Sequence, residues 1–476
     1  MRVVSFVNPL EFEFEGTVCK NAVCLGDIDN DGQNELVVGN EKGTLAIFKG
    51  EKSHPVEVIH VLGMLTAVAV GDVCNLGHNV LVAVTGCGIC YIYDFENGLG
   101  GDPTEKGDLQ PIHVQHIPAN VKDIIIEDIN GDGLAEMVVG LTDRVVRTYR
   151  WMNAGNIVGG KTNGKLVGLH KWELVDQIGN ISSSECPDGT PSILVAQPGG
   201  TYFALKPGAL GDSDQDSFDE NMSVLYHGLA SSRLRNPQID TQIVGNIKLD
   251  FYVCSSERSS ASRSNSISGD MTECDFPVKF GFGDTQSDCS SLGKFSVNHE
   301  EEISSRHPST SNEDHSAKVV IGFAVATLDG TLMLVHNNKI QWNLQVDHQI
   351  FSVHALDVTG DDREEVVACA WDGNTYIVCQ NTDCVRFSFP HPVSTFKAGR
   401  YGIRGKQVPS LVYVTFHNRI YLYPDISMPH LVTTSVTELL KKEPRYHRFL
   451  DKIGVDVTDK TLQKEINHFL LYGRLK

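Results

Sequence analysis

The chain has 476 residues, which is enough for one large domain or about three average ones. Its 60 acidic and 40 basic residues give a formal charge of −20, and such a surface repels nucleic-acid backbones and anionic lipids. Neither nucleic-acid binding nor polybasic membrane binding is therefore a good first hypothesis. The 44 glycines indicate frequent turns, which together with 41% hydrophobic residues favours β architecture.

The sequence predicts a cytoplasmic protein. Residues Met1–Glu15 contain no apolar core of a secretory signal. The longest apolar stretch, Val61–Val84, is interrupted by Asp72, Asn75 and His78, so we interpret it as two strands and not as a membrane span. The 12 cysteines are scattered along the chain, and we expect them to be reduced and mostly buried.

One pattern recurs seven times: a short apolar run, a turn, and a second apolar run with alternating character. Each copy predicts a β-hairpin, and five of the six intervals between their turns lie between 43 and 57 residues, the length of one four-stranded blade. Because a single blade cannot bury both faces, such repeats pack radially. The sequence therefore predicts an all-β fold, a closed seven-bladed β-propeller over residues 1–426. The copies are Leu36–Phe48, Leu81–Tyr93, Met137–Tyr149, Ile193–Leu205, Phe323–Val335, Val366–Val378 and Leu411–Tyr423.

Two segments and the C-terminus interrupt the pattern. The acidic stretch at about 207–239 and the Ser-rich stretch at about 253–316 lack periodic apolar residues, which predicts disordered insertions near blade five. Residues 427–476 change to helical spacing, with a capping box at Ser435–Glu438. We expect a short α-helical tail that either packs on the propeller rim or docks a partner.

The N-terminal segment is predicted to close the ring. Val3–Phe14 precedes the first blade and contains the alternating Phe12 and Phe14. Left alone, it would be an unpaired edge. We expect it to supply a strand to the last blade.

Acidic loops precede several of the hairpins. Oxygen-bearing side chains at positions 1, 3, 5 and 9 around a tight turn are the ligands that calcium prefers. The alternative is that the Asp and Asn side chains only close the turn, so that the loops are empty. If metal binds, we expect the first loop to bind it first, because it has four carboxylates. The candidate ligands are Asp27, Asp29, Asp31 and Glu35 in the first loop; Asp128, Asn130, Asp132 and Glu136 in the second; and Asp357, Asp361 and Glu365 in a weaker third copy.

The two good loops are followed by Leu36–Gly39 and Met137–Gly140, and together with these runs they resemble the FG-GAP repeats of integrin α-chain propellers. Within that group, four segments resemble the family of integrin-α FG-GAP repeat-containing proteins over about residues 1–470. These segments are His116–Asn120, Thr142–Arg147, Gln345–Gln349 and Glu364–Gly373.

The resemblance implies a non-catalytic scaffold subunit of a KICSTOR-like complex, with a second β-propeller and a large scaffold subunit as partners and no required cofactor. Such a complex lies at the lysosome, recruits the GATOR GTPase-activating complex and restrains the target-of-rapamycin kinase (TORC1) during amino-acid or glucose deprivation. The chain would then reach the lysosomal membrane only through its complex. The acidic loops leave one alternative, a calcium-dependent extracellular adhesion or ligand-binding propeller of the integrin-α type.

The sequence does not predict an enzyme. Gly399–Lys406 looks like a phosphate-binding loop, but five residues separate its outer glycines where four are needed, and Gln407 replaces the required Ser or Thr. The sequence contains no nucleophile elbow and no paired metal-binding histidines.

Overall fold

The computed structural model describes residues 2–96, 98–99, 109–153, 164–186, 189–207, 224–228, 238–249, 320–337 and 339–428. The chain divides into two units, Met1–Cys254 with Val319–Lys476, and Ser255–Lys318. The second unit lies outside the described residues, so every strand below belongs to the first unit.

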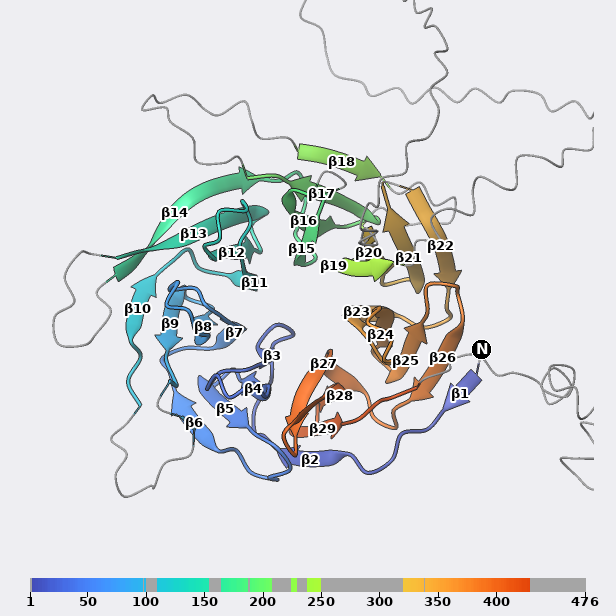
Figure 1. Ribbon diagram of the computed structural model, residues 1–476, viewed down its shortest axis with the longest axis horizontal. Coiled ribbons are helices and arrows are strands. Elements are labelled where there is room, and N and C mark those ends of the chain that lie inside the picture. Colours follow the sequence, from blue (N-terminus) through green and yellow to red (C-terminus); the bar gives the residue numbers. More distant parts are fainter. Residues whose placement is uncertain are drawn as a thin grey trace, which may run out of the picture. The chain divides into compact units, whose positions relative to one another are not determined.

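Seven sheets surround a common axis as the blades of a propeller (Figure 1). The innermost strand, called the first strand of its blade below, is β3, β7, β11, β15, β19, β23 or β27, and β1 and β2 lie at the outer edges of blades six and seven. Blade one contains β3 (Val23–Gly26), β4 (Glu35–Gly39), β5 (Thr44–Phe48) and β6 (Glu57–His60). Blade two contains β7 (Leu65–Gly71), β8 (Val80–Thr85), β9 (Ile89–Tyr93) and β10 (His113–His116). Blade three contains β11 (Val121–Glu127), β12 (Glu136–Leu141), β13 (Val145–Asn153) and β14 (Gly164–Glu173).

The remaining four blades follow in chain order. Blade four contains β15 (Ile181–Glu185), β16 (Pro191–Gln197), β17 (Thr201–Leu205) and β18 (Val224–Gly228), and blade five contains β19 (Thr241–Leu249), β20 (Val320–Thr327), β21 (Thr331–His336) and β22 (Lys339–Gln345). Blade six contains β1 (Arg2–Val4), β23 (Ile350–Leu356), β24 (Glu365–Ala370), β25 (Asn374–Val378) and β26 (Cys384–Ser388). Blade seven contains β2 (Leu10–Glu13), β27 (Val393–Ile403), β28 (Lys406–Thr415) and β29 (Arg419–Tyr423).

The seven-bladed propeller is confirmed, and each predicted hairpin forms the second and third strands of one blade. The second strands are buried on both faces because each blade packs between two neighbours. Leu36, Val37 and Val38 of β4, for example, are all fully buried. Seven apolar clusters fill the seven interfaces between adjacent blades, so the core is a ring of side chains around the axis.

The N-terminal segment closes the ring, though not along its whole length. Strand β2 pairs antiparallel with β29 of blade seven, as predicted, and Phe12 is buried against Phe48 with ring centroids 4.6 Å apart. Strand β1, which contains Val3, pairs parallel with β26 of blade six instead. The prediction for Val3 was therefore wrong: the chain crosses from one blade edge to the next between β1 and β2.

Strand β18 lies inside the stretch predicted as a disordered insertion. It pairs antiparallel with β17 and supplies the fourth strand of blade four. The prediction of disorder was therefore wrong for Val224–Gly228. The insertion predicted at 253–316 and the helical tail predicted at 427–476 lie outside the described residues, except for Ser427 and Met428.

The structure describes nine of the cysteines, and all nine are free thiols. Cys87, in the turn between β8 and β9, is exposed, whereas the other eight are buried or half-buried. Burial raises the pKa of Cys24 and of Cys90 to about 12, so both stay protonated at neutral pH.

Candidate functional site

The three acidic loops occupy the same place in blades one, three and six, between the first and second strands. In each loop the first Asp accepts backbone N–H bonds from the turn. Asp27 accepts from Asp31 at 3.0 Å and from Gly32 at 2.9 Å. Asp128 and Asp357 accept equivalent bonds within their own loops. These bonds are those of an Asx turn, which was the alternative to metal binding.

The last Glu of each loop also accepts a backbone bond. Glu35 accepts from the N–H of Ile28 at 3.0 Å, and Glu136 and Glu365 accept from Ile129 and Val358 at 3.2 and 3.0 Å. All three glutamates are buried. One oxygen of each is thus committed to holding the loop closed, which leaves the other oxygen to face the loop interior.

In blade one, the loop interior contains the ammonium group of Lys49, which directly follows β5. The Lys49 Nζ lies 2.6 Å from Asp29, 2.7 Å from Asp31 and 3.0 Å from Glu35. The oxygens of Asp27, Asp29 and Glu35 lie within 4.8 Å of one another, so the predicted ligands do converge. They converge on a cation that belongs to the chain itself.

The charges in this cluster are strongly coupled. Burial alone would lower the pKa of Lys49, but the hydrogen bonds to Asp29, Asp31 and Glu35 outweigh it and raise that pKa. Burial raises the pKa of Glu35 to about 7, against the opposing effects of the Ile28 N–H and of Lys49. One ammonium therefore serves three carboxylates, and it is firmly held in the charged state.

Blade three repeats the arrangement with an arginine. The guanidinium of Arg150, on β13, donates from Nε to Glu136 at 2.7 Å and from Nη2 to Asp132 at 2.6 Å. Asn130 accepts a bond from the Asp132 N–H at 3.0 Å and so belongs to the turn. Two of the second set of predicted ligands, Asp132 and Glu136, are therefore also brought together around a side-chain cation.

Blade six differs because Cys379 stands where blades one and three have Lys49 and Arg150. The Cys379 thiol lies 3.6 Å from Glu365, and the Thr359 hydroxyl donates to Asp361 at 2.9 Å. The nearest positive charge comes from blade seven, where Arg400 Nη2 lies 3.5 Å from Asp357. The loop also contains Arg363, which is exposed and whose Nη1 lies 3.9 Å from Asp361, but it has no basic side chain at the position of Lys49 and Arg150.

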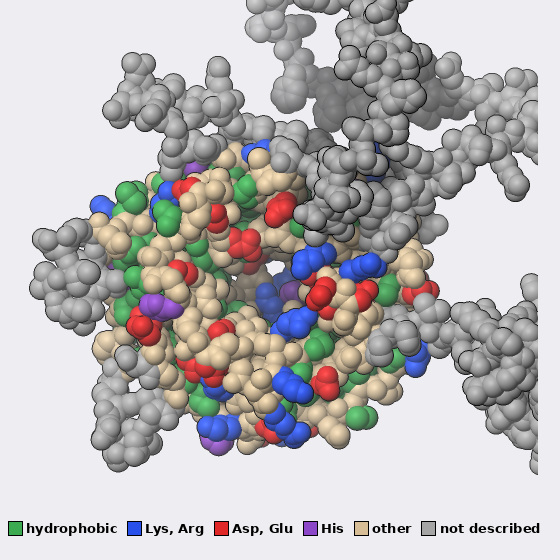
Figure 2. Space-filling view, in the orientation of Figure 1, with side chains coloured by type: hydrophobic (Ala, Val, Ile, Leu, Met, Phe, Trp, Pro, Cys, Tyr) green, Lys and Arg blue, Asp and Glu red, His purple; other side chains and the backbone are tan. Residues whose placement is uncertain are grey.

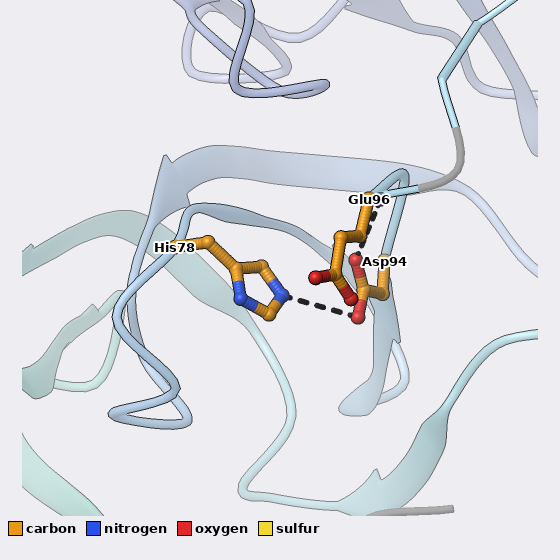
Figure 3. A group of neighbouring side chains, drawn as sticks. All are labelled: His78, Asp94 and Glu96. Atoms are coloured by element: carbon orange, nitrogen blue, oxygen red, sulfur yellow. Dashed lines mark hydrogen bonds and ion pairs between the residues drawn. The ribbon is translucent and has the colours of Figure 1, made fainter. Parts of the chain in front are cut away.

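In blade two the positions of the basic and acidic groups are exchanged relative to blades one and three (Figure 3). Asp72 closes the turn by accepting from the N–H groups of Leu76 and Gly77, both at 2.7 Å. His78 of the same loop points toward Asp94, which follows β9, and the His78 Nε2 lies 3.2 Å from the Asp94 carboxylate. The exposed Glu96 stands beside them, with its ligand oxygen within 4.8 Å of the other two. Here the basic group comes from the loop and the acidic group from the strand.

The basic partners were missed at the sequence level, although a signal exists. Lys49, Asp94, Arg150 and Cys379 each stand 22 residues after the first Asp of their loop. A residue at this spacing lies on the third strand of the blade, as Arg150 does, or directly after it, and its side chain lies beside the loop between the first and second strands. Comparing the residue 22 positions after the first Asp in each repeat would have shown a basic residue, Lys49 or Arg150, in the two blades with the most acidic loops.

The centre of the ring contains a second charged group that the sequence did not reveal. Lys20 precedes β3, yet its ammonium donates to Gln242 of blade five and, at 2.5 Å, to the backbone oxygen of Phe351 in blade six. Burial lowers the pKa of Lys20 to about 7, opposed by Asp240 and assisted by Lys122. Blade one is adjacent to neither blade five nor blade six, so Lys20 links blades across the axis. Figure 2 shows the central opening with basic and acidic side chains around it.

The face opposite the acidic loops carries exposed apolar side chains. We call it the turn face, because it holds the turns between second and third strands and the connections between blades. The two kinds of segment are linked, for example by the Val61 N–H bonded to the Gly43 oxygen at 2.8 Å. Leu62 and Val175 are each 79% exposed and Phe416 is 61% exposed. The other large exposed apolar residues here are Met64 and Trp371.

Comparisons with known proteins give the chain its family. The family model described as Integrin-alpha FG-GAP repeat-containing protein 2 matches residues 49–264 and 289–428. The protein called KICSTOR complex protein ITFG2 from Mus musculus is 36% identical, with 99% of this chain and 96% of that protein covered. This chain belongs to the integrin-alpha FG-GAP repeat-containing protein 2 family. The Bos taurus member of the family is also 36% identical, covering 93% of this chain and 75% of its own.

Solved structures support the fold of this family member. A crystal structure of BBS1N in complex with ARL6DN, soaked with mercury, aligns with a TM-score of 0.55 at 14% identity, covering 91% of this chain and 100% of that one. The same complex soaked with lead aligns with a TM-score of 0.52 at 14% identity, covering 89% and 98% of the two chains. At this identity the likeness shows the propeller fold and nothing about ligands.

Proposed function

We propose that this chain is a non-catalytic scaffold subunit of a KICSTOR complex. The observation that carries the proposal is its 36% identity over almost the whole length of a protein called a KICSTOR complex protein. The architecture fits a scaffold, because a ring of seven blades gives a rigid body with two broad faces.

The described residues support a binding role better than a catalytic one. The Gly399–Lys406 sequence lies in the β27–β28 hairpin, whereas a phosphate-binding loop joins a strand to a helix. The acidic side chains of blades one and three are engaged by Lys49 and Arg150, which also disfavours the alternative of a calcium-dependent adhesion propeller.

We infer that the turn face binds another subunit of the same complex, a second β-propeller. Leu62, Val175 and Phe416 are large apolar side chains that stand mostly in water on this one face. Protein interfaces are built around such anchors, which bury apolar area on association. On the opposite face, Lys49 and Arg150 already contact acidic side chains of the blade-one and blade-three loops.

Substitution on the two faces tests this assignment. Glutamate at Leu62 and at Phe416 should abolish co-purification of the partner subunits, because it places charge in the centre of the interface. Leu134→Glu, in the blade-three acidic loop and 42% exposed, is the matched control and should leave co-purification intact. Equal recovery of the partners with all three variants would contradict the use of the turn face.

We also propose a regulatory role for the chain within this complex. As a KICSTOR subunit, the chain would help recruit the GATOR complex and restrain TORC1 when amino acids or glucose are scarce, reaching the lysosome through its partners. In the described part of the chain, no helix has the length and apolar character needed to span a membrane. Deleting the large scaffold subunit should remove this chain from lysosomes, and deleting this chain should leave TORC1 active during starvation. Lysosomal retention in the first case, or normal inhibition of TORC1 in the second, would contradict the corresponding part.

A further inference from the structure

We propose that Lys49 and Arg150 are built-in cations that take the position a calcium ion would have in the acidic loops of blades one and three. Those two loops are then closed to divalent metal. This inference concerns the loops alone and does not depend on the proposed complex.

The geometry of blade one carries the argument. Three carboxylates from the loop approach a single point, and the Lys49 ammonium occupies it at 2.6 to 3.0 Å from each. Calcium requires about six to eight oxygen ligands at about 2.3–2.6 Å, and it would need the same oxygens. Both cations cannot occupy this position, so calcium could enter only if the Lys49 side chain left the loop.

The covalent attachment of Lys49 to the chain also disfavours its replacement by calcium. Its ammonium is joined covalently to the strand beside the loop, so its local concentration does not depend on the solution. Its side chain is 26% exposed, and it contacts Glu35, which is fully buried. Expelling the ammonium would leave charge inside the blade without a counter-ion until a metal arrived.

The repeat supplies an independent comparison. The residue 22 positions after the first loop Asp is Lys49 in blade one and Arg150 in blade three, the two blades with the richest acidic loops. It is Asp94 in blade two, where the loop itself provides the basic His78. Each of these three blades thus pairs loop and strand with opposite charges. Cys379 in blade six is the exception, which makes that loop a natural contrast.

Removing the ammonium should convert the blade-one loop into a calcium site. The Lys49→Met variant keeps a linear side chain only one atom shorter and loses the charge. Asp29 Oδ1 is already buried without a hydrogen-bond donor, and the variant would add the oxygens of Asp31 and Glu35 that Lys49 releases. Oxygens of three carboxylates, those of Asp29, Asp31 and Glu35, are then available to a hard cation beside the Asp27 turn.

The test is thermal unfolding of the full chain in EDTA and in calcium. In about 10 mM calcium, the Tm of Lys49→Met should rise by about 3 °C, as expected for a site with a Kd near 1 mM, whereas wild type and Lys49→Arg should not show this rise. Lys171→Met is the matched control, because Lys171 forms an exposed ion pair with Glu173, and it should behave as wild type. Magnesium should not replace calcium in the Lys49→Met variant.

Two outcomes overturn the proposal. The first is a folded Lys49→Met chain with no calcium response, because the ammonium then does not occupy a metal position. The second is a wild-type calcium response that Asp29→Asn combined with Asp31→Asn abolishes, because the loop then binds metal despite Lys49. Should Lys49→Met not fold, the comparison of wild type with this double variant decides: equal calcium responses support closed loops, and a lost response refutes them.

Discussion

Lys49 shows how one side chain can determine the chemistry of a whole loop. It neutralises acids that a sequence pattern assigns to a metal, and its own position after β5 looks like that of any strand-end lysine. The spacing of the blade-one loop indicated that its acids lie together, and oxygens of Asp27, Asp29 and Glu35 do lie within 4.8 Å of one another. Their counter-ion was not predicted, because it approaches from a different strand and only the fold brings it near.

Loss of the Lys49 charge should destabilise the protein when no metal is present. We expect Lys49→Met to lower the free energy of unfolding by about 3 kcal/mol, the lower end for breaking a buried ion pair, because Lys49 keeps some exposure. Lys49→Arg should recover most of this loss. Urea denaturation in EDTA measures both, and unchanged stability of Lys49→Met would show that the cluster does not need its cation.

Lys20 leads to a second prediction for a single residue, which concerns how the free energy of unfolding depends on pH. Its pKa is lowered to about 7 in the folded chain, whereas an unfolded lysine titrates near 10.4. Between about pH 7 and 10 the unfolded state therefore binds more protons, and the contribution of Lys20 to stability rises with pH. Below about pH 7 both states are protonated, so this contribution is constant.

The measurement compares wild type with Lys20→Met by urea denaturation at about pH 6, 8 and 9. The difference in unfolding free energy should shift in favour of wild type as the pH rises. Using the difference cancels the titration of the buried cysteines, which is common to both chains. A difference that is constant with pH would show that the Lys20 ammonium titrates normally.

At the scale of elements, the ring closure by β2 is the feature on which the fold depends most. Phe12 is 1% exposed and lies in the interface between blades seven and one. Phe12→Ala should lower the free energy of unfolding by about 3–5 kcal/mol, because it leaves a cavity in the closing interface. Phe416→Ala, at an exposed position, should change stability by no more than about 0.5 kcal/mol. Similar losses for the two variants would contradict closure through β2.

The elements also show which parts of the fold the sequence could predict. The hairpins were predictable because alternating apolar residues such as Leu81–Tyr93 are constrained by packing on both sides. The pairing of β1 with β26 was not, because three residues of an edge strand can add to either of two neighbouring blades with similar local chemistry. β18 was missed because a polar and acidic sequence surrounds it, so its register with β17 comes from the fold and not from a local pattern.

At the scale of the whole molecule, the propeller divides its two faces between different tasks. The acidic loops of blades one and three hold their carboxylates against Lys49 and Arg150, while the turn face leaves large apolar side chains in water. A net charge of −20 keeps such a surface soluble and unattractive to anionic membranes. Together these features indicate a rigid body that binds other proteins.

The central claim is that this chain functions as one subunit of a protein complex. The most direct measurement is affinity purification of the tagged chain from cells at native expression, followed by mass determination of the eluted particle by light scattering and identification of its components. We expect a particle much heavier than the single chain, with a second β-propeller and a large scaffold subunit in fixed ratio to it. Recovery of this chain alone, at the mass of a monomer, would contradict it.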